Sequence, residues 1–130
     1  MAHVHEQVVR EAYAAFSAGD LDGLRGTMTE DITWHVPGRN RFSGDYVGMD
    51  KVLGYLGRLA EESEGTFHIE ELHDVLAGDE HAVSLHRSSA VMDGEKNQFR
   101  EILVFHFKDG KISEIWEAGA DTYEYDAVFG

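Results

Sequence analysis

The spacing of apolar residues changes near the middle of the chain, and this change limits the possible folds more than any other feature. Before residue 65, apolar residues recur three or four positions apart, which is typical of helices with one buried face. After residue 65, β-forming residues begin to alternate, which is typical of strands. An Asp-Gly pair at residues 93–94 is a strong signal for a two-residue hairpin turn, and a second pair follows at residues 109–110. The sequence therefore predicts helices followed by a hairpin-connected sheet.

The expected elements can be placed from these patterns. Three helices are expected: one ending at Ala18-Gly19, one from Leu21 to about Thr29, and one from about Asp50 to Glu61. A short strand, residues 31–36, ends at a Pro-Gly turn, and a glycine-punctuated loop follows over residues 38–48. The later strands are expected at residues 66–77, 81–92, 99–107 and 111–117, before an aromatic, acidic tail. The strand at 99–107 is largely apolar on both sides, so we expect both of its faces to be covered.

Helices in one half and hairpin-connected strands in the other make an α+β domain, which we expect to occupy residues 1–130 as one unit. A curved, mostly antiparallel sheet would wrap around the three helices of the N-terminal half as a cone-shaped half-barrel. Such a cone has a mouth, and ligand pockets favour barrel mouths.

The composition excludes several classes of function. The chain carries 25 acidic residues against 11 Lys and Arg, a formal charge of −14, which disfavours binding to nucleic acid and to anionic membranes. There is no cysteine, so disulfides and thiolate chemistry are excluded. The eight histidines are scattered, and neither metal-binding nor nucleotide-binding motifs occur, so we expect no metal and no cofactor. Without a long apolar run, a cytoplasmic location is expected.

Four segments together resemble a known family. They read AYAAFSAGDL at residues 12–21, WHVPG at 34–38, SGDYVG at 43–48 and DGKISEIWE at 109–117. In this order they resemble the nuclear transport factor 2-like superfamily, and within it the SnoaL-like and ketosteroid-isomerase-like small proteins. The resemblance implies a cone-shaped fold, a homodimer, and a deep apolar pocket between sheet and helices. It does not imply one chemistry, because this fold hosts isomerases, cyclases, epoxide hydrolases, dehydratases and binding proteins.

The residues that carry steroid isomerisation in such proteins are absent here. The resemblance places the proton-abstracting aspartate at Val36, the protonated acid of the oxyanion site at about Leu103, and the tyrosine at Ala12, one place from Tyr13. The constellation of the ketosteroid isomerases is therefore rejected.

The SnoaL-like polyketide cyclases imply a different candidate. They resemble this chain in having an acid just after the tryptophan of the last strand, where Glu117 stands. A carboxyl group in an apolar pocket has its charged form disfavoured, which raises its pKa toward the range useful for proton transfer. The histidine that the resemblance would place on the neighbouring strand is replaced by Leu103 or a residue close to it.

Three further residues are candidates for proton transfer or for polarising an oxygen atom. Glu101 has the same strand parity as Leu103, so it is expected among apolar neighbours with either Arg87 or His86 as its partner. His35 titrates near neutral pH, although its parity is opposite to that of Val36 and a structural role is the alternative. Tyr13 can donate a hydrogen bond to a ligand carbonyl, or be a core tyrosine with its hydroxyl satisfied.

The sequence thus predicts a homodimeric protein with an apolar pocket for a small organic molecule. If it is an enzyme, acid/base chemistry on a carbonyl or epoxide compound is expected, such as isomerisation, cyclisation or hydration, with Glu117 or Glu101 moving the proton. The alternatives are a non-catalytic binding module and an epoxide hydrolase, for which we find no Asp-Arg-Asp-like relay. The residues expected to line the pocket are Trp34, Val36, Phe16, Phe99, Leu103, Phe105 and Leu56.

Overall fold

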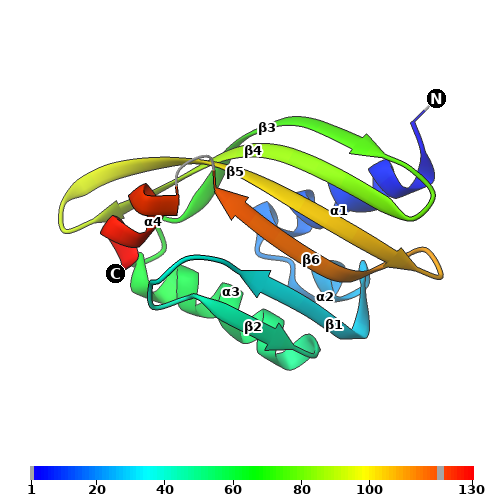
Figure 1. The fold of residues 1–130 in the computed structure, drawn as a ribbon, viewed down its shortest axis with the longest axis horizontal. Coiled ribbons are helices and arrows are strands. Elements are labelled where there is room, and N and C mark those ends of the chain that lie inside the picture. The colour runs from blue at the N-terminus through cyan, green and yellow to red at the C-terminus, as the bar shows by residue number, and fades with distance from the viewer. Residues whose placement is uncertain (1, 120–121) are drawn as a thin grey trace.

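The computed structural model describes residues 2–119 and 122–130 as a curved sheet of six strands with helices against its inner face (Figure 1). The strands are β1 (Met28–Val36), β2 (Gly44–Val47), β3 (His68–Ala77), β4 (His81–Met92), β5 (Glu95–Lys108) and β6 (Lys111–Gly119). The helices are α1 (Val4–Ala18), α2 (Leu21–Arg25), α3 (Met49–Glu62) and α4 (Thr122–Phe129). The α+β prediction is confirmed.

The sheet is antiparallel except at one pair of strands. Its order is β2-β1-β6-β5-β4-β3, and β1 runs parallel to β6. Both predicted turns are present, with φ of 53° and 80° at Asp93 and Gly94 and of 52° and 80° at Asp109 and Gly110. Positive φ at both central residues identifies the hairpin turns whose twist matches that of the strands. These turns join β4 to β5 and β5 to β6, and they fix the register of these three strands.

Four predictions about the elements are corrected by the structure. The second helix ends at Arg25 rather than near Thr29, and β1 begins at Met28. The glycine-punctuated loop contains the short strand β2. The tail forms helix α4, because Tyr125 and Phe129 pack their rings against Phe99, with centroids 4.7 and 5.6 Å away.

The two faces of β5 have different surroundings. Leu103 and Phe105 are buried against the helices, whereas Ile102 and Val104 point to the outer face, where Ile102 remains 36% exposed. We predicted that both faces would be covered, but the helices cover only the inner one in a single chain. Among the described residues, none of the helices has the length and apolar character needed to cross a membrane.

Candidate functional site

A cavity lies between the inner face of the sheet and the helices α1 and α3. It encloses about 640 Å³, including its opening to solvent. Most of its wall is aliphatic or aromatic, and the polar side chains in the wall are Tyr13, Tyr55, His86, Glu101, Glu117 and Tyr125, together with the Trp34 indole. The cavity is therefore apolar with a few polar groups on its wall.

Most of the residues predicted for the site lie around this cavity. The structure brings together there Tyr13, Phe16, Trp34, Leu56, Glu101, Leu103, Phe105 and Glu117. They come from α1, β1, α3, β5 and β6, so no short stretch of sequence contains the site. The chemical roles of these residues remain predictions.

Three predicted site residues lie elsewhere. His35 is on the outer face, because it alternates with Trp34 along β1 and stacks on Trp116 with ring centroids 5.8 Å apart. Val36 is buried at the end of β1, where it pairs with Gly44 of β2 rather than lining the cavity. Phe99 is covered by the rings of α4, a helix that the sequence pattern did not predict.

Glu117 is held on the cavity wall by two neutral donors. The Trp34 indole N–H and the Tyr55 hydroxyl both donate to its Oε1 atom, each at 3.2 Å. Trp34 comes from the neighbouring strand β1, and Tyr55 comes from the helix α3 that covers it. Since both bonds reach Oε1, Oε2 is the oxygen that carries the proton when the carboxyl group is neutral.

Burial sets the protonation state of Glu117. Desolvation raises its pKa to about 8, with a further contribution from the nearby charge of Glu101, although the bonds from Tyr55 and Trp34 act in the opposite direction. The carboxyl group is therefore mostly protonated at neutral pH, when it can donate a proton. A pKa close to the working pH also allows the group to take the proton back.

A second polar group lies on the same inner face. His86 of β4 is directly opposite Glu101 of β5, with 3.6 Å between Nε2 and Oε2. The Tyr13 hydroxyl from α1 lies 2.5 Å from His86 Nδ1, and Ser88 donates to Glu101 Oε1 at 2.6 Å. The register resolves the choice left by the sequence: His86 faces Glu101, whereas Arg87 points outward to Glu70.

Sequence reasoning missed Tyr55 and considered His86 only as a partner for Glu101. The spacing of Val52, Tyr55 and Leu59 places Tyr55 on the buried stripe of α3, so a signal was present. Within residues 2–119 and 122–130, no three His, Asp or Glu side chains form a set that could hold a metal ion.

Comparison with known proteins relates the chain to one family. The model of the SnoaL-like domain matches residues 9–115. The uncharacterized protein Rv0034 of Mycobacterium tuberculosis is 32% identical over 115 residues, covering 88% of this chain and 87% of the relative. Bal32a, from a soil-derived mobile gene cassette, is 33% identical with a TM-score of 0.93, and 98% of this chain and 97% of that chain are covered. TerC, co-crystallised with polyporic acid, has the same fold, with a TM-score of 0.86, 15% identity and 98% of each chain covered.

Proposed function

This chain belongs to the SnoaL-like domain family, within the nuclear transport factor 2-like superfamily, and we propose that it is a cofactor-independent acid/base enzyme acting on a small apolar carbonyl compound. The observation that carries the proposal is Glu117, a carboxyl group on the wall of an apolar cavity with a pKa raised to about 8 by burial. Such a group can protonate a substrate oxygen at neutral pH and recover the proton afterwards.

The two donors to Glu117 support this role. Trp34 and Tyr55 fix the orientation of the carboxyl group without neutralising it, because neither donor is charged. When Glu117 gives up its proton, the same two bonds stabilise the carboxylate that forms. The site therefore holds the group in one orientation in both protonation states, which reduces the reorganisation that proton transfer requires.

Enolisable ketones and epoxides of bicyclic size are the compounds to test first. The wild-type protein should accelerate exchange of α-protons for deuterium in such ketones, or the opening of such epoxides. The variant Glu117→Gln keeps an acceptor for Trp34 and Tyr55 but has no proton to transfer, so its rate should fall by about 10²- to 10⁴-fold. The wild-type rate should also decline as the pH rises through about 8. Full activity of Glu117→Gln would contradict the proposal.

A binding module for an apolar small molecule is the second candidate. It is supported by the large apolar share of the cavity wall and by the TerC structure, a protein of the same fold co-crystallised with polyporic acid. In that case the wild type and Glu117→Gln would bind the same compounds with similar affinity and neither would convert them.

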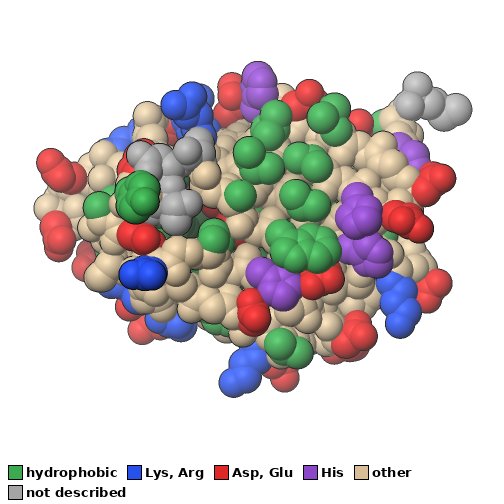
Figure 2. All heavy atoms as spheres, viewed as in Figure 1, with side chains coloured by type: hydrophobic (Ala, Val, Ile, Leu, Met, Phe, Trp, Pro, Cys, Tyr) green, Lys and Arg blue, Asp and Glu red, His purple; other side chains and the backbone are tan. Residues whose placement is uncertain are grey.

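We also propose that the outer face of the sheet joins two copies of the chain. Figure 2 shows hydrophobic side chains gathered on this face beside several histidines. The apolar members are Leu76, Val83, Leu85, Ile102, Val104 and Trp116. An exposed apolar patch on a chain with a charge of −14 is costly unless it is covered. Sedimentation should give a dimer for the wild type and a monomer for Trp116→Asp.

A further inference from the structure

Behind Tyr13, a line of polar side chains crosses the inner face of the sheet. Ser84, His86 and Ser88 are two residues apart along β4, so all three point inward, and all are almost completely buried. His86 lies opposite Glu101, whose side chain is 5% exposed. Buried polar groups of this kind need partners, and here the partners are one another.

The groups around His86 indicate which of its ring nitrogens carries the proton. Glu101 accepts a hydrogen bond from the Ser88 hydroxyl on Oε1, and its Oε2 lies 3.6 Å from His86 Nε2. A carboxylate oxygen accepts protons, so Nε2 is the protonated nitrogen and Nδ1 has a free lone pair. The Tyr13 hydroxyl, 2.5 Å from Nδ1, is then the donor of that bond. The order is Tyr13 O–H to His86 Nδ1, and His86 Nε2–H toward Glu101.

We propose that Tyr13 and His86 form a proton relay opposite Glu117, so that the substrate is a ketone with an acidic C–H bond and the reaction moves a proton between two of its carbons. This inference rests on the proposed role of Glu117. Tyr13 touches the substrate and is the catalytic residue of the relay, His86 receives the proton that Tyr13 releases, and Glu101 positions His86.

The proton transfers balance as follows. The substrate C–H bond breaks and its proton forms a bond to the Tyr13 oxygen, while the Tyr13 hydroxyl proton passes to His86 Nδ1. The C–H electron pair becomes a C=C bond, and the carbonyl oxygen takes the proton of Glu117, giving an enol. His86 gains one positive charge while Glu117 becomes negative, so the net charge of the cavity is unchanged. Return of the proton through Tyr13 to another carbon, and of the enol proton to Glu117, gives the isomer and restores the protein.

The surroundings of Tyr13 explain why a relay is needed. Its burial raises the pKa of the hydroxyl, and the charges of Glu101 and Glu117 raise it further, although the bond with Ser84 lowers it. A free phenolate is therefore disfavoured, and Tyr13 can accept a proton only while it passes its own to His86. The imidazolium that results lies beside the Glu101 carboxyl group and is stabilised by it.

The position of the two carboxyl groups matches this division of roles. Glu101 pairs with Gly119 and Glu117 pairs with Leu103, so the two acids are diagonal neighbours on the inner face. Glu101 is engaged by His86 and Ser88, whereas Tyr13 and Glu117 both belong to the wall of the same cavity, so one compound in the cavity can meet both of them.

The test uses 2-tetralone, a bicyclic enolisable ketone, with deuterium exchange at its α-carbons followed by NMR. Tyr13→Phe and His86→Asn should lower the exchange rate by about 10²-fold. Their dissociation constants for 2-tetralone should stay within about twofold of the wild-type value, measured by the quenching of Trp34 fluorescence in a Trp116→Phe background. Tyr46→Phe is the matched control, because its hydroxyl donates to the Phe42 carbonyl and lies outside the cavity wall.

The outcomes separate the two proposals. If Tyr13→Phe and His86→Asn exchange at the wild-type rate while Glu117→Gln does not, the relay is wrong and the role of Glu117 stands. If the wild-type protein exchanges no deuterium, the proposed acid/base function on such ketones is overturned. Nitrogen NMR of labelled histidine gives a test that does not depend on activity: a proton on His86 Nδ1 in the free protein would overturn the relay.

Discussion

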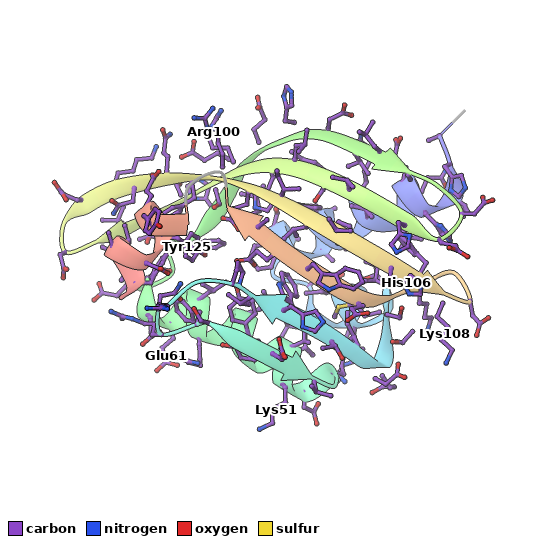
Figure 3. All side chains as sticks on the ribbon, in the orientation of Figure 1. Lys51, Glu61, Arg100, His106, Lys108 and Tyr125 are labelled. Atoms are coloured by element: carbon purple, nitrogen blue, oxygen red, sulfur yellow. The ribbon has the colours of Figure 1, made fainter. Side chains whose placement is uncertain are left out.

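The two tryptophans of the chain each lie beside a titratable group, but on opposite faces of the sheet. On the inner face, Trp34 donates a hydrogen bond to Glu117. On the outer face, Trp116 stacks on His35, and His35 lies between Asp45 at 2.7 Å and Glu114 at 2.5 Å. Figure 3 labels His106, another side chain of the outer face, near Lys108 at the end of β5.

The difference teaches that a raised pKa has a different cause on each face of the sheet. Inside, desolvation raises the pKa of Glu117 to about 8, so the carboxyl group keeps its proton. Outside, hydrogen bonds to Glu114 and then Asp45 raise the pKa of His35, because they favour the charged imidazolium. The strand β6 thus supplies Glu117 to the cavity on one face and Glu114 to the contact with His35 on the other.

The largest expected effect is a fall in the stability of the wild type as the pH rises, which should be absent in Glu117→Gln. A folded-state pKa of about 8 against an unfolded value of 4.5 means that the folded protein holds the proton more tightly. The free energy of unfolding of the wild type should therefore fall by about 2–4 kcal/mol between about pH 5 and about pH 8, and stay level above that. Glu117→Gln should not lose this stability, and the measurement is urea unfolding at several pH values. Glu114→Gln, on the outer face of the same strand, is the control and should retain the fall.

The next effect is the difference in the free energy of unfolding between alanine variants of two neighbouring residues of β5. Leu103 is 5% exposed on the inner face, whereas Val104 is half-buried on the outer face. Leu103→Ala should lower the free energy of unfolding by about 2–4 kcal/mol, and Val104→Ala by less than about 1 kcal/mol, at protein concentrations where the chain is monomeric. Equal losses would show that the outer face is as tightly packed as the inner one.

The fluorescence of Trp34 should report the ionisation of Glu117 directly, because the two side chains are hydrogen-bonded on the inner face. In Trp116→Phe, Trp34 is the remaining tryptophan, and its emission should change with a midpoint near pH 8 as Glu117 loses its proton. The double variant Trp116→Phe/Glu117→Gln should show a flat response over the same range. A midpoint near the ordinary pKa of a glutamate would mean that the carboxyl group is solvated, and the comparison between the faces would fail.

The smallest expected effect is the change in the free energy of unfolding when His35, on the outer face, is replaced. The raised pKa of His35 stabilises the folded protein below the ordinary histidine pKa, and this stabilisation is lost as the pH rises through the folded-state value. Because the His35 side chain is 30% exposed and its partners are more so, His35→Gln should cost no more than about 0.5 kcal/mol at pH 5.5 and nothing measurable at pH 9. Urea unfolding at these two pH values measures it, and a loss that persists at pH 9 would point to packing on Trp116 instead.

Much of the fold could be predicted from local patterns. The alternation of β5 and the Asp-Gly turns are properties of neighbouring residues, so the strand and the turns on either side of it could be predicted from the sequence. Helix α4 was not predicted, because Tyr125 and Phe129 pack against Phe99, which lies on a different element. The short strand β2 was missed for a similar reason, since its pairing with β1 determines its conformation.

The candidate site was only partly predictable. Glu117 was singled out by the resemblance to the SnoaL-like polyketide cyclases and Glu101 by its strand parity with Leu103, and the structure places both at the cavity. The contact of His86 with Tyr13 joins residues 73 positions apart in the sequence, and no spacing rule relates a helix at the N-terminus to a strand in the second half. The same holds for Tyr55, whose helical stripe shows burial but not the carboxyl group it meets.

The parallel pairing of β1 with β6 also determines when the site can form during folding. The two hairpins β4–β5 and β5–β6 join neighbouring segments and close small loops, so we expect them to form early. The Trp34–Glu117 bond joins residues 83 positions apart and needs the parallel pair, whose loop closure is entropically slow. Chain collapse would therefore come before the Trp34–Glu117 hydrogen bond forms. In a partly folded chain, Glu117 would be an ordinary solvated carboxylate. The unusual proton affinity of this residue would then be acquired in the last step of folding, together with the native state itself.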